Sequence, residues 1–499
     1  MNPPTIVTIQ LLDNPRVGIP IFPWVTVKYS SVDKFSFKWM RLSADYEVKN
    51  RKQKKKDKTG VEVEKTGQMT VVSNMERYTP TKEDIGCKLT VSLELKEGFS
   101  GYSGAVQANT TKNPVQASLM DGNEVIPYKL RHIHTAKRLE SPGFRIMSYN
   151  ILADCYANTE FTLDKLAPYM EKKYIDLSGH RLPLLIDEIS GYNCDIVALQ
   201  EVEKSTFEKT LTNRFSLNNM GGAYAQKDKQ KDGVAIFYCQ NRFKFIRQQI
   251  CHPKNCLLSV QSIEKQIGYN IGSDGVKIPD HVKKWYTDGA EIMKTTAIQL
   301  LNNLISPGQV HQVVTLQDRE MSRTVGYPVF LVVGNTHLYF HSMACHTRLF
   351  QIKVLHDMLV AAEKDLLKRY PEAKVTKLLL GDLNAKPGQG AVQFLQGGNI
   401  PVNHIEWYAG GREQYTGKLE LSPEIKFTSA IDFSKIKFTT YVNNFIGVLD
   451  YIFFEEDKIE LERYLDQPSD ELVTKDIGMP SKVFPSDHIA QVVDLKWKV

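Results

Sequence analysis

The chain has 499 residues, of which 42% are hydrophobic and 24% charged, with a formal net charge of +6. This length exceeds one ordinary domain, so we expect two domains with sizeable cores. The sequence contains no run of 18 apolar residues, so we expect no membrane-spanning helix. The seven cysteines include no C-x-x-C pair, which argues against a disulfide framework or a zinc site and favours reduced intracellular thiols.

Residues 1–110 alternate apolar and polar side chains in short runs, as half-buried strands do, for example at 25–29, 35–40 and 89–93. The stretch 78–89 resembles the approach to a late strand of an immunoglobulin-like domain, with Trp39 in the core on an earlier strand. We therefore predict a β-sandwich domain over 1–110 and a linker with some strand content over 111–143.

A basic tract, 49–58, lies between two of these predicted strands. Such a tract is compatible with a solvated hairpin loop. It is also compatible with a contact to the phosphate backbone of a nucleic acid, which would be salt-dependent and blind to base sequence.

From Phe144 the pattern changes to strands that alternate with long helical stretches. Strands are predicted at 144–149, 195–199, 233–238, 296–301, 329–333, 377–380, 449–454 and 489–495, and helices at 181–192 and 346–370. Sheets covered by helices on their outer faces predict a layered α/β sandwich over 144–499.

The strand at 377–380 contains three leucines in succession, so we expect it to be buried on both faces. It ends at Gly381, after which Asp382 and Asn384 follow at spacing i and i+2. Alternation along an extended chain would place both polar side chains on the same side.

Polar residues recur at the ends of the apolar strands. The set is Asn150, Glu201, His337, Asp382, Asn384, Asp450, Asp487 and His488. A single strand-end Asp or Asn usually caps a turn, but Asp450 stands within an apolar run and needs a partner or a ligand if buried. Carboxylates with histidines and no cysteine match a hard cation, Mg²⁺ or Mn²⁺, and amides and histidines beside such an ion suit a phosphate substrate.

Four motifs follow one another along this region, and two further segments accompany them. The motifs are Leu199-Gln200-Glu201-Val202, Gly381-Asp382-Leu383-Asn384, Leu449-Asp450-Tyr451-Ile452 and Ser486-Asp487-His488-Ile489-Ala490. With them, residues 144–499 resemble the exonuclease–endonuclease–phosphatase superfamily, and segments 147–153 and 335–339 narrow the resemblance to its deadenylase branch. The resemblance implies a four-layer α/β sandwich, two packed β-sheets flanked by helices, here preceded by the immunoglobulin-like domain.

Within this branch the chain is similar to the 2′,5′-phosphodiesterases, which degrade 2′,5′-oligoadenylate and trim poly(A). The likeness is carried by 149–154, 159–161 and 494–498, and by 76–80 and 84–86 in the N-terminal domain. The implied partners are adenylate oligomers and poly(A) RNA, with no membrane and no protein partner expected.

The resemblance also implies roles for the acidic residues and one amide. Glu201 resembles the principal Mg²⁺ ligand, with Asp382, Asn384 and Asp487 in the same metal site. Asp382 would orient or deprotonate the attacking water, and Asn384 would bond the scissile phosphate. The family reaction is a direct in-line displacement by water.

The remaining roles concern the phosphate and the base. His488 would stabilise the phosphorane, Asp450 would orient that histidine, and Asn150 and His337 would contact phosphate oxygens. Phe445 matches an aromatic that stacks on adenine in deadenylases.

The chain departs from the family pattern at two positions. Ser342 replaces a proline that usually forms the other side of the base pocket. Asp232-Gly233 stands where Glu-Gly is more usual.

We therefore predict a Mg²⁺-dependent phosphodiesterase that releases AMP from 2′,5′-oligoadenylate and 3′,5′ poly(A). The alternatives are a poly(A)-only deadenylase, a nocturnin-like dinucleotide phosphatase and an RNA-binding pseudoenzyme. The resemblance implies the mitochondrial matrix. The first twenty residues carry one basic residue, Arg16, and do not resemble a transit peptide, so the cytoplasm stays an alternative.

Overall fold

The computed structural model describes residues 4–11, 14–30, 32–44, 68–96, 107–119, 124–253, 308–408 and 420–498. The basic tract 49–58 and the predicted strand 296–301 lie outside these ranges. The chain divides into two compact units, the first comprising 1–126, 170–188 and 208–219 and the second comprising 127–169, 189–207 and 220–499.

The first unit contains two antiparallel sheets. Strands β1 (Thr5–Gln10) and β2 (Trp24–Lys28) form one, and β4 (Met69–Ser73), β3 (Phe35–Leu42), β5 (Lys88–Leu95) and β6 (Gln107–Thr110) form the other in that order. Trp39 is fully buried in a core with Val91 and Leu93, as the alternating pattern predicts. The unit also includes the short helices α3 (Lys172–Ile175) and α6 (Thr212–Ser216).

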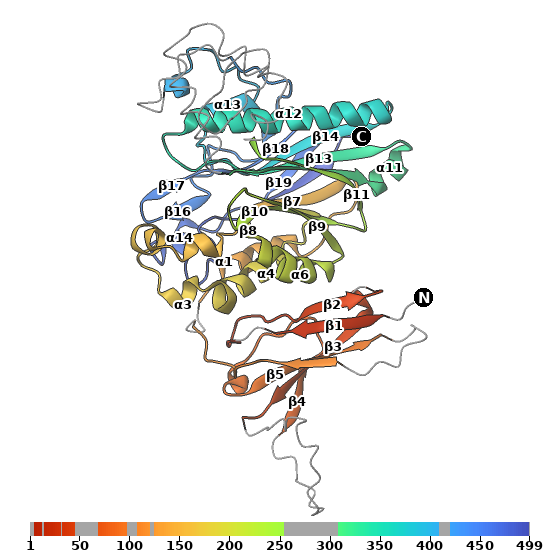
Figure 1. Ribbon diagram of the computed structural model, residues 1–499, viewed down its shortest axis with the longest axis vertical. Coiled ribbons are helices and arrows are strands. Elements are labelled where there is room, and N and C mark those ends of the chain that lie inside the picture. The colour runs from red at the N-terminus through yellow and green to blue at the C-terminus, as the bar shows by residue number, and fades with distance from the viewer. Residues whose placement is uncertain are drawn as a thin grey trace, which may run out of the picture. The chain divides into compact units, whose positions relative to one another are not determined.

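The second unit contains two six-stranded mixed sheets (Figure 1). The first runs β19 (Ile459–Tyr464), β20 (Gln491–Trp497), β7 (Gly143–Asn150), β8 (Ile196–Glu203), β10 (Asp232–Cys239) and β9 (Met220–Gln226). The second runs β11 (Phe243–Cys251), β12 (His311–Asp318), β13 (Val329–His337), β14 (Lys374–Asp382), β18 (Asp450–Phe454) and β15 (Thr428–Ser429). The neighbours β7 and β8, and β13 and β14, are parallel, so their polar C-terminal ends meet at one edge.

The remaining described α-helices are short, except for the long helix α12. They are α1 (Pro127–His132), α2 (Asp154–Ala157), α4 (Leu182–Gly191), α5 (Lys204–Thr206), α11 (Arg319–Val325), α12 (Cys345–Arg369), α13 (Gly390–Leu395) and α14 (Asp470–Thr474). Helix α4 begins in the first unit, which contains 170–188. A small hairpin of β16 (Thr440–Val442) and β17 (Phe445–Gly447) belongs to the second unit.

Strand β14 is buried on both faces, as its leucine run predicts. Leu378 and Leu380 join the core between the two sheets, and Leu379 joins the core between the second sheet and α12. On α12, Leu355 and Leu359 pack in the latter core, which confirms the predicted helical face. The architecture is therefore an α/β sandwich of two packed mixed sheets with flanking helices, as predicted, and the immunoglobulin-like identity of the first unit stays a prediction.

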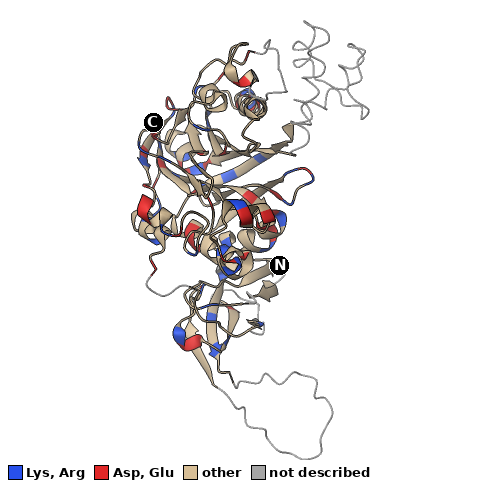
Figure 2. Ribbon diagram, turned by 90° about the vertical axis from the view of Figure 1, so that its left-hand side faces the viewer, with Lys and Arg blue, Asp and Glu red and all other residues tan. Residues whose placement is uncertain are grey.

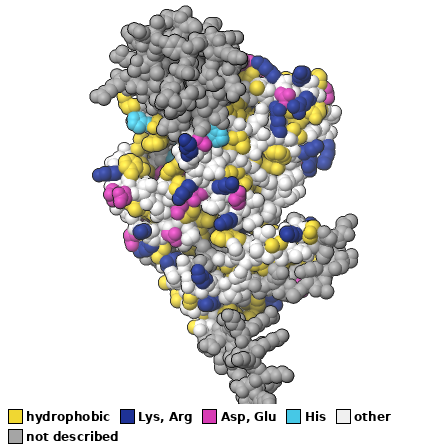
Figure 3. All heavy atoms as spheres, viewed as in Figure 1, with side chains coloured by type: hydrophobic (Ala, Val, Ile, Leu, Met, Phe, Trp, Pro, Cys, Tyr) yellow, Lys and Arg dark blue, Asp and Glu magenta, His cyan; other side chains and the backbone are white. Residues whose placement is uncertain are grey.

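The surface carries charges of both signs. Figure 2 shows Lys and Arg interspersed with Asp and Glu along helices and loops, and the face drawn in Figure 3 has no large patch of one sign among the described residues. Among the described helices, none is long and apolar enough to span a membrane.

Candidate active site

Three neighbouring strands of the second sheet bring His337, Asp382 and Asp450 together. In the strand register His337 pairs with Asp382 on the parallel side, and Asp382 pairs with Asp450 on the antiparallel side. Gly381 makes this possible, because its φ is +149° and a Cβ there would lie 2.1 Å from the Thr336 carbonyl oxygen. A glycine thus lets β14 approach β13 just before the acidic end of the strand.

The first sheet contributes Asn150 from β7 and Glu201 from β8. The Asn150 Nδ2 donates to Glu201 Oε1 at 3.0 Å and to Asp382 Oδ2 at 3.1 Å, so this one amide joins the two sheets. The Ala153 main-chain N donates to Glu201 Oε2 at 2.9 Å. Glu201 itself has a φ of +56°, which is unusual for a residue other than glycine and common at functional sites.

His488 reaches the same edge from the segment that precedes β20. Its Nδ1 lies 2.8 Å from Asp450 Oδ2, and its Nε2 lies 3.7 Å from Asp382 Oδ2. On the other side of Asp382, His337 Nε2 lies 3.6 Å from the same Oδ2 atom. Three side chains, Asn150, His337 and His488, therefore converge on one carboxylate oxygen.

Asn384, Asp487 and Phe445 are placed differently. Strand β14 ends at Asp382, and Asn384 has a φ of +47°, so strand alternation does not extend to it. Its main-chain N donates to Asp382 Oδ1 at 2.9 Å, and its Nδ2 donates to the Leu338 carbonyl oxygen at 2.9 Å. Asp487 is half-buried beside His488, and Phe445 lies on β17, half-buried, without a described contact to the acidic cluster.

Burial raises the pKa of both central acids. For Glu201 the nearby Asp487 carboxylate adds to this effect, while Lys227 opposes it. For Asp382 burial and then the Asp450 carboxylate raise the pKa from 3.8 to about 7. Without a cation, the cluster therefore favours holding a proton.

The two histidines are shifted in opposite directions. Burial and then the Lys227 ammonium hold the pKa of His337 well below 6.5, so this ring is neutral. Burial acts in the same direction on His488, but Asp450 and then Asp487 outweigh it and raise the pKa of His488 well above 6.5. One neutral and one charged imidazole thus flank Asp382.

The residues present fit a hard divalent cation. The Asp382 and Asp450 carboxylates each offer a ligand oxygen, and these oxygens and a ring nitrogen of His488 lie within 4.8 Å of one another. Asp450 Oδ1 is buried and has no hydrogen-bond partner in the described part of the chain. A buried carboxylate oxygen without a donor is costly unless a cation or water meets it, and oxygen-rich donors select Mg²⁺ or Mn²⁺.

The site also contains residues that the motifs did not reveal. Lys227, directly after β9, lies 2.8 Å from Asp232 Oδ2, and Tyr156 donates to Asp232 Oδ1 at 2.8 Å. Thr439 donates to Asp450 Oδ2 at 2.5 Å. In the sequence, only the departure from the family pattern at Asp232-Gly233 indicated that this region contributes to the site. Isolated Lys, Tyr and Thr residues form no motif by which they could be found.

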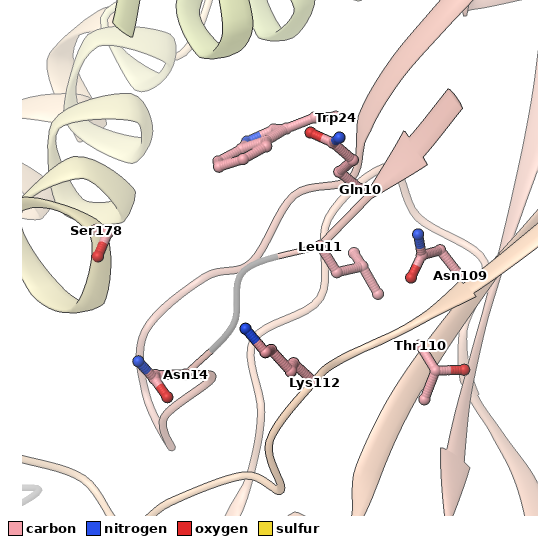
Figure 4. Close-up of a pocket in the computed structure, with 8 residues that line it drawn as sticks. All are labelled: Gln10, Leu11, Asn14, Trp24, Asn109, Thr110, Lys112 and Ser178. Carbon is pink, nitrogen blue, oxygen red and sulfur yellow. The ribbon is translucent and has the colours of Figure 1, made fainter. Parts of the chain in front are cut away.

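A pocket of about 440 Å³ in the first unit has different chemistry (Figure 4). Trp24, Asn109, Lys112 and Ser178 are among its lining residues, which include no carboxylate and no histidine. It therefore lacks the carboxylates that would neutralise a divalent cation, and it is not the candidate active site.

Comparison with known sequences places this cluster in a family context. A family model described as the Endonuclease/Exonuclease/phosphatase family matches residues 147–488, more than half of the chain. The Mus musculus protein named 2′,5′-phosphodiesterase 12 is 30% identical over 501 residues, covering 100% of this chain and 74% of that protein. The Schizosaccharomyces pombe CCR4-Not complex 3′-5′-exoribonuclease subunit Ccr4 is 24% identical over 391 residues. This match covers 73% of this chain and 50% of the Ccr4 subunit.

A solved structure supports the fold. The crystal structure of ANGEL2, a 2′,3′-cyclic phosphatase, in complex with adenosine-2′,3′-vanadate, matches with a TM-score of 0.52 and 18% identity. The match covers 72% of this chain and 96% of ANGEL2. At this identity the likeness confirms the α/β sandwich alone.

Proposed function

The chain belongs to the Endonuclease/Exonuclease/phosphatase family, and from this premise we propose that it is a Mg²⁺-dependent phosphodiesterase of adenylate oligomers. The reaction is hydrolysis of a terminal 2′,5′ or 3′,5′ phosphodiester, with release of AMP. The family and relatives named phosphodiesterase and exoribonuclease make the chain an enzyme, so the RNA-binding pseudoenzyme is no longer needed as an alternative. The mitochondrial location stays a prediction.

The observation that carries the proposal is the convergence on Asp382 Oδ2. Asn150 Nδ2, His337 Nε2 and His488 Nε2 lie 3.1, 3.6 and 3.7 Å from this oxygen. A water molecule or phosphate oxygen beside Asp382 would therefore meet nitrogen donors from three directions. Such fixed donors stabilise charge that develops on a phosphate without reorganising during the reaction.

Each of the converging side chains has a separate role in the proposed hydrolysis. The Asp382 carboxylate, which meets nitrogen atoms of Asn150, His337 and His488, is placed to orient the attacking water and to accept its proton. Asn150 and the neutral His337 hold non-bridging oxygens, and the cationic His488, aligned by Asp450, balances the negative charge of the phosphorane. Hydrolysis then proceeds in line, with no covalent enzyme intermediate.

The metal would be held by Glu201, Asp382, Asn384 and Asp487, and the partnerless Oδ1 adds Asp450 to these proposed ligands. When bound, the ion supplies charge neutralisation at the phosphate.

A direct test is AMP release by the purified protein with Mg²⁺ from 2′,5′-triadenylate and from 3′,5′-oligo(A). Glu201→Gln should lower kcat by at least about 100-fold while the circular dichroism spectrum is retained. Glu460→Gln, on an exposed position of β19, is the matched control and should keep full activity. Full activity of Glu201→Gln would contradict the metal assignment.

The similarity to Ccr4 favours a second candidate, a deadenylase confined to 3′,5′ linkages. Turnover of the two triadenylate isomers, measured side by side, separates the candidates. Release of AMP from the 3′,5′ isomer alone would select the second.

A further inference from the structure

We propose that Lys227 is a positioning residue that determines which ring nitrogen of His337 carries the proton. Only the kinetic part of its test rests on the proposed function. Lys227 is buried, with 4% of its side chain exposed, and its ammonium lies 2.8 Å from Asp232 Oδ2. Asp232 is completely buried, so the pair is a charge-compensated unit inside the protein.

The Lys227 Nζ lies 3.4 Å from His337 Nδ1. An ammonium group has N–H donors and no lone pair, so Nδ1 must be the acceptor in this contact. A neutral imidazole that accepts at Nδ1 carries its proton at Nε2. The same contact excludes a doubly protonated ring, because a proton on Nδ1 would point at the ammonium group.

This tautomer directs a donor at the centre of the site. Nε2 lies 3.6 Å from Asp382 Oδ2, so the Nε2–H bond faces the place where the reacting phosphate is expected. In the opposite tautomer Nδ1–H would face Glu201 Oε1, which lies 3.9 Å away, and the Nε2 lone pair would face the Asp382 carboxylate. Lys227 excludes that arrangement because two donors would then face each other.

The surrounding contacts hold Lys227 and His337 in this relation. The Tyr156 hydroxyl donates to Asp232 Oδ1 at 2.8 Å, and the Lys227 main-chain N donates to the Asp232 carbonyl oxygen at 3.0 Å. Residues 308 and 309 connect the segment of Lys227 to the strand of His337. The Gly308 carbonyl oxygen accepts from Asp228 N at 2.8 Å, and Gln309 Nε2 donates to the His337 carbonyl oxygen at 2.8 Å. The departure to Asp232 from the family pattern thus lies in the network that anchors this lysine.

The tautomer can be read directly by NMR of ¹⁵N-histidine-labelled, metal-free protein, with His337→Gln identifying the signals. Unsubstituted protein should show a protonated Nε2 and an unprotonated Nδ1 at His337. Lys227→Met should lose this pattern, and Lys227→Arg, which also only donates, should keep it. Lys231→Met, an exposed lysine of the same turn, is the matched control and should leave the signals unchanged.

Kinetics supply the second readout. Lys227→Met should lower kcat by about 10- to 100-fold with little change in KM, and Lys227→Arg should restore most of it. If Lys227→Met does not fold, the double variant Lys227→Met with Asp232→Asn removes both buried charges and takes its place. A retained Nε2–H tautomer in whichever variant folds would overturn the proposal. Because the NMR readout needs no substrate, that result is distinguishable from failure of the proposed reaction.

Discussion

The Nδ1 atom of His488 lies 2.8 Å from Asp450 Oδ2, and this contact fixes the only strongly cationic imidazole described in the site. Thr439 donates to the same oxygen at 2.5 Å, and the other oxygen, Asp450 Oδ1, is buried without a hydrogen-bond partner among the described residues. One carboxylate therefore has two tasks: one oxygen orients His488, and the other is available to a cation.

Asp450→Asn should lower kcat by about 100-fold or more and shift the alkaline limb of the pH–rate profile to lower pH. Burial favours the neutral form of His488, and Asp450 is the first of the groups that outweigh it. Removing that charge lowers the pKa of His488, so the imidazolium is lost at a lower pH. The measurement is kcat against pH from 6 to 10 for both proteins.

The exposed Asp466→Asn serves as the control and should leave the profile unchanged. Stability gives an independent check. The folded pKa of His488 lies above its unfolded value, so its stabilising contribution is complete below about pH 6.5 and is lost as pH rises through the folded pKa. Asp450→Asn should remove this alkaline loss of Tm; an unaltered limb and an unaltered Tm profile would contradict the pairing.

Mg²⁺ should raise Tm more at pH 8 than at pH 6. The folded pKa of Asp382 is about 7 against an ordinary 3.8, so metal-free protein gains stability from its proton below about pH 4 and loses that gain as pH rises through 7. Binding of an ion must displace the proton at pH 6 and need not at pH 8. Thermal unfolding with and without Mg²⁺ at both pH values measures the difference.

Asp382→Asn should remove most of the pH dependence of this Mg²⁺ effect, because the substituted group does not titrate in this range. Asp457→Asn, exposed in the turn after β18, should behave like the unsubstituted protein. A Mg²⁺-induced rise in Tm of equal size at both pH values would show that the ion does not compete with a proton at Asp382.

The features of the fold and of the site that follow a regular sequence pattern could be predicted. Leu378 to Leu380 and the helical spacing of α12 have a regular period, so their buried faces were predictable and are confirmed. The strand-end residues His337 and Asp382 were predictable because parallel strands present their C-terminal ends at one edge.

Other features have no local pattern. Whether Lys227 meets His337 depends on the path of the β9–β10 turn, which no periodicity encodes. The side chain of Asn384 does not follow the alternation of the strand, because β14 ends before this residue and the backbone of Asn384 is left-handed. The Asp450–Thr439 contact depends on a loop conformation in the same way.

Gly381→Ala should destabilise the protein by about 3 kcal/mol or more, since its Cβ would lie 2.1 Å from the Thr336 carbonyl oxygen and its φ of +149° is unfavourable for alanine. Backbone atoms cannot move aside as a flexible side chain can. Gly388→Ala is the matched control, with a φ of +84° and open space around the Cβ, and should cost only about 1–2 kcal/mol. Urea unfolding measures both, and equal losses would show that the close approach to β13 is not required.

Phe445→Ala should weaken binding of oligo(A) by about 1–3 kcal/mol, roughly 5- to 150-fold in KM. Phe445 lies half-buried on β17, and its ring has the Lys386 ammonium 4.9 Å from its centroid. The paired strand β16 connects this hairpin to the site, because Thr440 bridges to His488. An adenine stacked on Phe445 would thus be joined to a phosphate near His488 by one rigid hairpin.

The selectivity of this effect is what identifies stacking. Phe445→Trp should restore KM, and cleavage of a small phosphodiester without a base, bis-p-nitrophenyl phosphate, should be unchanged in Phe445→Ala. Phe245→Ala, a partly exposed phenylalanine on β11, should leave both activities intact. Equal losses on oligo(A) and on the small diester would instead mean that Phe445 supports the catalytic groups through the hairpin, because a base contact cannot affect a substrate that has no base.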